Sequence, residues 1–367
     1  MSTISVETLR TWLEEQRDVF VLDVRSSSDY QEWAIPGSLH VDAYDALKRH
    51  DPEALASLQL DVSRPVVTVC GAGKTSQIAA QQLAARGVPV YSLEGGMKAW
   101  SLAWNTAEIA LPPGSARVIQ IRRTGKGCLS YVIGDGESAL VIDASLDPQV
   151  YLNLAAQQGW RITSVLETHI HADHLSRSGQ LAKLSGATLY LPDQQRVSFL
   201  ATLLRNGDTL ESGKIRLMAI HTPGHTGEST CYLLQGQVLF TGDTLFPTGI
   251  GRPDLDASQE EAAARADALY HSLQKLLTLP SSTLVLAGHT STPVPFDGVP
   301  VMTTLAEVEE QVDLLHVSHF DFAQRLLERL PVTPPNYMQI VRLNEQGSFP
   351  DGPVTELEAG ANRCAIS

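Results

Sequence analysis

The sequence is poor in cysteine and basic residues, and it lacks any long apolar run. Its four cysteines are scattered over 367 residues, so they do not form the framework of a small disulfide-rich secreted protein. We therefore expect a reducing, cytoplasmic setting. No apolar run reaches the length that crosses a membrane. The first residues carry glutamate and have no apolar core, so we expect no signal peptide.

Acidic residues outnumber basic ones in the chain as a whole. Lysine and arginine number 27 against 41 aspartates and glutamates, which gives a formal net charge of -14. Nucleic acid and anionic membrane surfaces are therefore not expected partners, because both carry negative charge. The hydrophobic fraction of 43% is ordinary for globular cores, and the length favours two or three domains.

The first hundred residues alternate between helical and strand patterns. Residues 5–16 have helical spacing, with Ser5 placed to cap the helix, and a second helix is expected at 76–87. Short β-branched apolar runs predict strands at 19–25, 66–70 and 88–93. This alternation predicts a small parallel α/β domain over residues 1–104.

The composition changes near residue 105. Residues 105–116 contain paired prolines and no periodicity, so we expect a linker. Strand-like runs then alternate with helical segments over residues 117–367, which predicts a mixed α/β sandwich. Near its end we expect a helix at 304–315 and an extended segment at 333–344, held by two prolines.

Seven ligand-type side chains follow apolar strand runs, and four of them lie in the single stretch THIHADHLSRSG. The seven are His169, His171, Asp173, His174, His225, Asp243 and His289. Strand ends at the mouth of a sheet are where α/β proteins build sites, so these side chains are expected to share one site. Neutral imidazoles with carboxylates suit Zn(II) or Fe(II).

The pattern H-x-H-x-D-H, followed by a Gly-His, a Gly-Asp and a second Gly-His, resembles the metallo-β-lactamase superfamily over residues 115–300. The resemblance implies an αββα sandwich with a metal site at one edge. Two arrangements stay open. A glyoxalase II-like site would use all seven residues for two Zn ions, with Asp243 bridging. In the persulfide dioxygenase branch, the residues matching His169, His225 and Asp243 hold one Fe(II), and the other four orient them.

A second stretch, CGAGKTS, carries different chemistry. Cys70 ends an apolar strand run, and a glycine-containing loop leads from it into a helix. The loop residues are Gly71, Ala72, Gly73, Lys74 and Thr75. Loop amides, the helix N-terminus and the Lys74 charge would all stabilise a thiolate or persulfide anion on Cys70.

With the flanking stretches at 21–41 and 90–100, this loop resembles a single-domain rhodanese over residues 1–104. The resemblance implies that Cys70 carries a persulfide. Thr75 stands where the family often has arginine, and threonine cannot grip an anion with two N–H groups, so the sulfur donor is expected to differ.

Together the resemblances imply an enzyme of sulfur metabolism. The expected reaction is Fe(II)-dependent oxidation by O2 of a low-molecular-weight persulfide, such as glutathione persulfide, to sulfite. Cys70 would transfer sulfur among thiols, thiosulfate and sulfite. One alternative is a dinuclear Zn thioester hydrolase fused to a rhodanese domain. Another is a sulfur-relay adaptor with an inactive metal domain.

Further expectations concern substrate binding and assembly. Arg252 is predicted either to hold a carboxylate of the thiol carrier or to pin its loop through Asp254. Tyr337 is a candidate substrate-binding residue, in a segment with Asn336 that is expected either to cover the metal site or to pack at a subunit interface. We expect a homo-oligomer. The short linker predicts that the two sites exchange sulfur through a diffusible thiol.

Overall fold

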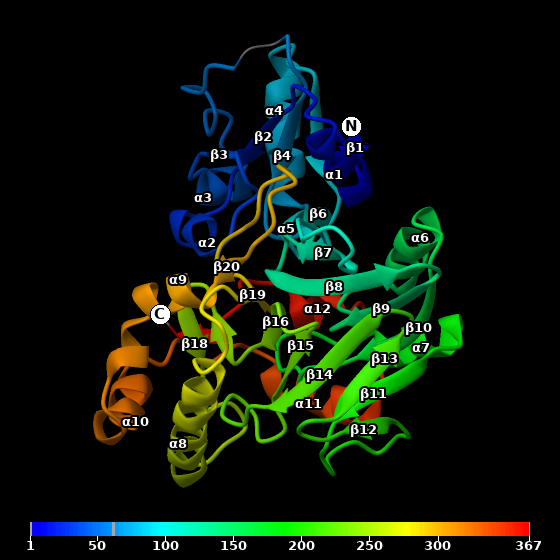
Figure 1. The fold of residues 1–367 in the computed structure, drawn as a ribbon. Helices are drawn as coiled ribbons and strands as arrows, with labels where there is room; N and C mark the ends of the chain where they lie inside the picture. Colours follow the sequence, from blue (N-terminus) through cyan, green and yellow to red (C-terminus); the bar gives the residue numbers. More distant parts are fainter. Residues whose placement is uncertain (1, 61–62, 367) are drawn as a thin grey trace.

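The structure is a computed structural model that describes residues 2–60 and 63–366 (Figure 1). A smaller N-terminal domain, blue to cyan in Figure 1, sits on one end of a larger two-sheet domain. The N-terminal domain holds a five-stranded sheet in the order β1-β5-β4-β2-β3, with every pair parallel. The predicted parallel α/β domain is therefore confirmed.

The N-terminal elements follow the sequence patterns closely. The strands are β1 (Thr3–Ile4), β2 (Phe20–Asp23), β3 (Leu39–His40), β4 (Val66–Val69) and β5 (Val90–Leu93). The helices are α1 (Val6–Glu14), α2 (Ser27–Glu32), α3 (Tyr44–Lys48), α4 (Thr75–Ala85) and α5 (Gly96–Trp100). Ser5 caps α1 as predicted, since its side chain accepts a hydrogen bond from the amide of Thr8. All four residues of β4 are buried, because apolar cores cover both faces of the sheet.

The larger domain is a sandwich of two sheets. The seven-stranded sheet has the order β12-β11-β10-β9-β8-β7-β6. Its strands are β6 (Asn105–Ile109), β7 (Arg117–Arg123), β8 (Cys128–Asp135), β9 (Ser138–Ile142), β10 (Arg161–Leu166), β11 (Thr188–Pro192) and β12 (Thr202–Leu204). The six-stranded sheet has the order β13-β14-β15-β16-β19-β20. Its strands are β13 (Thr209–Ser212), β14 (Ile215–His221), β15 (Thr230–Leu234), β16 (Val238–Gly242), β19 (Leu284–Ala287) and β20 (Thr303–Thr304).

Helices cover the outer faces of both sheets. One apolar core lies between the two sheets. A second core joins the seven-stranded sheet to its helices, and a third joins the six-stranded sheet to its helices. The first sheet is covered by α6 (Pro148–Gln157) and α7 (Ser178–Ser185). The second is covered by α8 (Gln259–Leu276), α9 (Leu305–Gln311), the 3-10 turn at Asp313–His316 and α10 (His319–Glu328). The predicted αββα layering is confirmed.

The C-terminal region returns to the sandwich edge. It contains α11 (Tyr337–Gln346), α12 (Thr355–Glu358) and β21 (Ala365–Ile366). Strand β21 joins a small sheet with β17 (Leu245–Phe246) and β18 (Gly249–Gly251). The extended segment expected at 333–344 is wrong, because α11 begins at Tyr337. Two prolines restrict only the residues beside them, and Asn336 with φ +65° then turns the chain into the helix.

The two domains are docked on each other by several contacts. Residues 105–109 of the expected linker form edge strand β6, which pairs with β7. The gold loop between β19 and β20 reaches up beside the N-terminal domain (Figure 1), where Phe296 packs on buried Trp100. The indole N–H of Trp33 also donates to the Thr124 carbonyl across 3.1 Å.

The expected helix at 304–315 is present as α9 and the 3-10 turn, which are separated at Val312.

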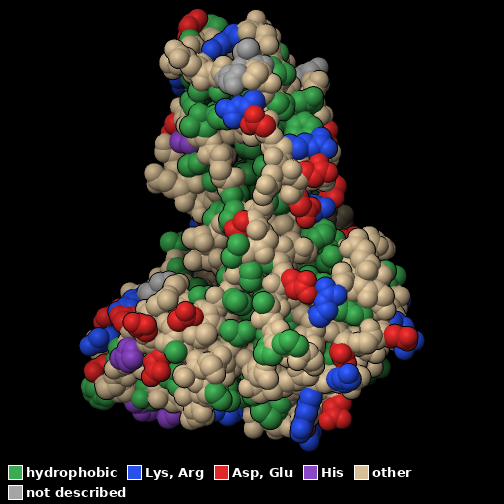
Figure 2. Space-filling model, turned by 45° about the horizontal axis from the view of Figure 1, so that its top comes forward, with side chains coloured by type: hydrophobic (Ala, Val, Ile, Leu, Met, Phe, Trp, Pro, Cys, Tyr) green, Lys and Arg blue, Asp and Glu red, His purple; other side chains and the backbone are tan. Residues whose placement is uncertain are grey.

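The outer surface carries charges of both signs. Figure 2 shows acidic and basic side chains interspersed over the visible face of both domains. Among the described residues, the structure has no helix with the length and apolar character needed to span a membrane.

Candidate active site

Three of the predicted ligands converge at the edge of the sandwich. His169 follows β10, His225 lies between β14 and β15, and Asp243 follows β16. The Nε2 atoms of His169 and His225 lie 3.8 and 3.6 Å from Oδ2 of Asp243. His169 Nε2 and Asp243 Oδ2 are buried and lack hydrogen-bond partners among the described residues. Buried polar atoms are normally paired, so these atoms fit a cation held between them.

Hydrogen bonds on the far side of each imidazole fix its orientation. The Nδ1–H of His169 donates to Thr168 Oγ1 over 2.9 Å, and that hydroxyl donates to Asp143 over 2.8 Å. The Nδ1–H of His225 donates to the Arg252 carbonyl over 2.8 Å. Both Nε2 atoms are left with lone pairs toward the shared point, as metal ligation requires.

Electrostatics favour the ligating protonation states. Burial, reinforced by nearby His171, lowers the pKa of His169 well below its usual value, and burial also lowers the pKa of His225. For Asp243 burial acts in the opposite direction, but His289 and the other histidines hold its pKa below the usual range. The three residues thus present neutral imidazoles and a carboxylate, a set that suits Fe(II) or Zn(II).

The other four predicted ligands form an adjoining group. His289 bridges two carboxylates, with Nδ1 2.5 Å from Asp243 Oδ1 and Nε2 2.7 Å from Asp173 Oδ2. His174 Nδ1 lies 3.0 Å from Asp173 Oδ1. His171 Nε2 contacts Glu167 Oε2 at 2.8 Å. His171 Nδ1 and His174 Nε2 are buried without hydrogen-bond partners among the described residues, so this group also has nitrogen atoms available to a ligand.

Two cysteines that the sequence reasoning did not assign lie at this site. Cys128, at the start of β8, places its Sγ 3.3 Å from Asp173 Oδ2 and 3.7 Å from His174 Nδ1. Burial and the Asp173 carboxylate raise the pKa of Cys128, but His174 and His289 together more than offset this, and the pKa falls to about 7. Cys364 precedes β21 and lies within ligand distance of Asp243 and His289. Neither cysteine is near the histidine motif in sequence, so no local signal marks them.

One further unassigned side chain holds the metal-ligand loop. Asn344 of α11 donates through Nδ2 to the carbonyls of His171 and His174, over 2.8 and 2.9 Å. Its Oδ1 accepts from the amide of Ser176 over 2.9 Å. A single amide therefore fixes both ends of the turn that carries His171, Asp173 and His174.

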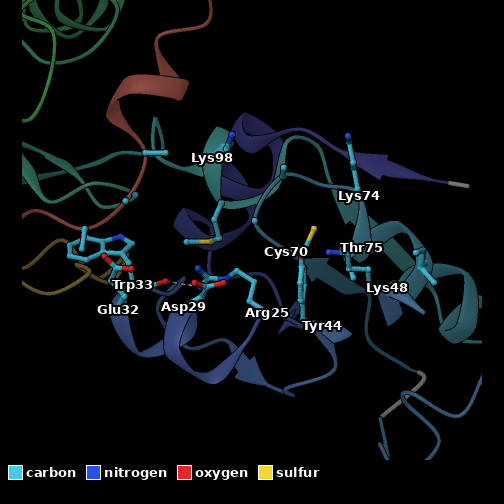
Figure 3. Close-up of a pocket in the computed structure, with 18 of the residues that line it drawn as sticks. Arg25, Asp29, Glu32, Trp33, Tyr44, Lys48, Cys70, Lys74, Thr75 and Lys98 are labelled. Atoms are coloured by element: carbon cyan, nitrogen blue, oxygen red, sulfur yellow. Dashed lines mark hydrogen bonds between the residues drawn. The ribbon is translucent and has the colours of Figure 1, made fainter. Parts of the chain in front are cut away.

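The Cys70 loop lines a cavity of about 620 Å³ between the N-terminal domain and residues 125 and 359–361 of the larger domain (Figure 3). Cys70 is buried, and its thiol donates to Ser76 Oγ over 3.3 Å. Among the described residues, the amides of residues 71–75 donate to no protein group, so they are available to an anion at the sulfur. The basic side chains that line the cavity are Arg25, Lys48, Lys74 and Lys98. Thr75 lines it as well.

Two glycines after β5 pack directly against this loop. Gly95 and Gly96 have φ of +67° and +56°. The amides of Met97 and Lys98 donate to the carbonyls of Cys70 and Gly71, over 2.8 and 2.9 Å. A Cβ on Gly96 would lie 2.1 Å from the Cys70 carbonyl, so only glycine fits there. The backbone at the start of α5 therefore holds the cysteine loop in place.

The two predicted substrate-binding residues lie in different surroundings. The guanidinium of Arg252 is fully buried, pairs with Asp254 at 2.8 Å and donates to the carbonyls of Val332 and Arg363. These contacts match the loop-pinning alternative. Tyr337 begins α11 and packs with Ile170 and Ala172 of the ligand loop.

Each of the two domains matches the model of a known protein family. Residues 123–289 match the family model of the metallo-beta-lactamase superfamily, and residues 5–103 match the rhodanese-like domain. The hydroxyacylglutathione hydrolase of Maricaulis maris is 34% identical over 166 residues, which is 44% of this chain. That of Brucella ovis is 35% identical over 164 residues, or 43% of this chain. The chain covers only 61% and 60% of these hydrolases' length.

Two solved structures share the fold. A metallo-beta-lactamase from Staphylococcus aureus subsp. aureus COL superposes with a TM-score of 0.59 at 27% identity, covering 65% of this chain and 75% of that one. ETHE1 from Myxococcus xanthus superposes with a TM-score of 0.55 at 31% identity, covering 63% of this chain and 98% of that one. The chain therefore belongs to the metallo-β-lactamase superfamily, with a rhodanese-like domain joined to its N-terminal side.

Proposed function

We propose that the chain is a persulfide dioxygenase with sulfurtransferase activity, in which His169, His225 and Asp243 hold one Fe(II). The observation that carries the proposal is the convergence of these three ligand atoms, with two of them buried and unpaired. Two histidines and one carboxylate leave coordination positions open for other molecules. The likeness to ETHE1 over almost all of that chain supports the same choice.

The overall reaction consumes a persulfide, O2 and water, and yields a thiol, sulfite and two protons. The persulfide's outer sulfur loses four electrons and O2 gains them, so no other oxidant is required. Iron, when bound, would supply the redox chemistry that joins persulfide sulfur to O2. The protein's part is positioning: Thr168 and the Arg252 carbonyl hold the two imidazoles, and Asn344 holds the loop beside them.

Sulfur transfer is assigned to Cys70. Its thiolate attacks the outer sulfur of thiosulfate, so that a Cys70 persulfide forms and sulfite leaves. A thiol then takes the outer sulfur, which regenerates the Cys70 thiolate and gives a thiol persulfide. The free amides of residues 71–75 and the basic side chains of the cavity stabilise the anions in both steps.

A dinuclear Zn thioester hydrolase is the second candidate. Its support is the complete set of seven ligand-type residues at one edge, together with 34% identity to a hydroxyacylglutathione hydrolase over 166 residues. The Cys70 domain has no evident use in such a hydrolysis, so we rank this function second.

Metal analysis of the anaerobically purified chain separates the two functions. The first proposal expects one Fe per chain, which His169→Ala abolishes and His174→Ala retains. It also expects that, with glutathione persulfide as the substrate, the amount of sulfite formed equals the amount of O2 consumed. Two tightly bound Zn per chain, a fall to one in His174→Ala, and hydrolysis of a hydroxyacylglutathione would overturn it in favour of the second.

A further inference from the structure

The Cys70 cavity adjoins a second cavity on the metal side. The second has a volume of about 480 Å³ and is lined by Asp173, Lys126, Arg363 and the residues at 333–335. Glu32 and the three residues 359–361 line both cavities. Figure 3 shows Glu32 and Trp33 on the side of the Cys70 cavity where the red C-terminal chain passes. One thin segment of chain thus separates the Cys70 cavity from a cavity that reaches Asp173, which His289 connects to the proposed ligand Asp243.

That segment is anchored at both ends and thin in the middle. At one end, the buried Glu358 carboxylate pairs with Arg123 at 2.7 Å and with Arg177. At the other end, Asn362 Nδ2 donates to Asp173 Oδ2 over 3.1 Å. Between them lie Ala-Gly-Ala, and a Cβ added to Gly360 would meet no atom within 4 Å. Between the fixed ends, small side chains and the ion pair of Glu32 with Arg363 are what separates the two cavities.

The sulfur on Cys70 cannot cross this distance on its own residue. Cys70 is 2% exposed, and its loop is tied to the start of α5 by two backbone hydrogen bonds. A mobile acceptor is therefore needed. In the first cavity four basic side chains stand against Asp29 and Glu32, which leaves an excess of positive charge. In the second, Lys126 and Arg363 balance Glu32 and Asp173, so the acidic end of a small thiol has a cationic partner in each cavity. Their volumes fall in the range that holds small ligands.

We propose that the two cavities form an internal passage, in which a low-molecular-weight acidic thiol takes sulfur from Cys70 and delivers it to the Asp173 side of the metal site without leaving the protein. This inference rests on the proposed function, and it replaces the exchange through a freely diffusing thiol that the linker length predicts. In the passage the thiol sulfur bonds to the outer sulfur of the Cys70 persulfide, the Cys70 S–S bond breaks, and the thiolate of Cys70 keeps its electron pair. The thiol persulfide then moves past residues 359–361.

The test is the time course of O2 uptake starting from thiosulfate and glutathione. The full chain is compared with an equimolar mixture of its Cys70→Ser and His169→Ala variants, in which the persulfide must cross bulk solvent. We expect the mixture to show a lag that lengthens in proportion to dilution, and the full chain to show none. An equal lag in both would overturn the passage.

A blocking variant gives an independent outcome. Ala361→Phe places a ring between the cavities, so the concentration-dependent lag should appear in this variant. Gly352→Phe adds the same ring at an exposed position with open space around it, so its time course should match that of the original chain. Absence of a lag in folded Ala361→Phe would overturn the proposal. Failure of the original chain to oxidise preformed glutathione persulfide would instead count against the proposed function.

Discussion

Replacing Glu358 by glutamine should strongly destabilise the C-terminal region. Its carboxylate is fully buried, pairs with Arg123 and Arg177, and accepts from the Leu175 amide over 2.7 Å. Burial raises its pKa, but the two arginines lower it from 4.5 to about 2. That shift corresponds to about 3 kcal/mol of stability at neutral pH, and losing one partner of a buried pair costs about 3–5 kcal/mol.

The pH dependence gives this prediction a second signature. Because the folded-state pKa is depressed, the stabilisation is complete above about pH 4.5 and is lost as the pH falls toward about 2. The difference in unfolding free energy between the original chain and Glu358→Gln should therefore shrink by about 2 kcal/mol between pH 7 and pH 3.

Urea unfolding at both pH values measures this difference. Glu356→Gln is the matched control, since Glu356 lies on the same helix but is exposed and pairs with Lys98 at the surface. Such a pair is worth less than about 1 kcal/mol. Equal losses in the two variants, or a loss for Glu358→Gln that does not change with pH, would refute the reasoning.

Three other substitutions test the two sites. Cys70→Ser should abolish sulfur transfer from thiosulfate, measured as thiocyanate formed from cyanide, while metal content by elemental analysis stays unchanged. Gly96→Ala should lower the melting temperature and abolish transfer because its Cβ meets the Cys70 carbonyl; Gly87→Ala, with φ +81° and open space, should cost only about 1 kcal/mol. Asn344→Ala should weaken metal binding in competition with a chelator by less than the about 10-fold that loss of a hydrogen-bond partner of a ligand imidazole costs, because Asn344 holds only the neighbouring backbone, and exposed Gln346→Ala should not weaken it. Unchanged metal affinity in Asn344→Ala would show that the loop holds its shape without this amide.

Sequence reasoning worked best where strands end. His169, Asp243 and His289 each follow a buried apolar run, and strands of one sandwich finish at a common edge, so their meeting could be predicted without coordinates. The capped helix at Ser5 and the parallel N-terminal sheet were equally accessible, because short-range hydrogen bonds and hydrophobic pattern determine them.

Contacts between distant parts of the chain were not accessible in this way. Glu358 meets Arg123 across 235 positions, and Asn344 meets His171 across 173. Neither side chain lies in a motif, and their role exists only after the C-terminal region folds back. The expectation of an extended segment at 333–344 failed for a related reason: proline limits its neighbours, but Asn336 and the burial of Ile340 decide where the chain turns.

The loop between β19 and β20 limits how this protein could be divided. Phe296, contributed by the larger domain, packs against Trp100 in the apolar core of the smaller one. A fragment that ends after residue 104 would keep Trp100 but lose that aromatic cover, and it would present the apolar face to water. The two halves are consequently not interchangeable modules: a transplanted N-terminal domain needs either this loop or a substitution that makes its uncovered face polar.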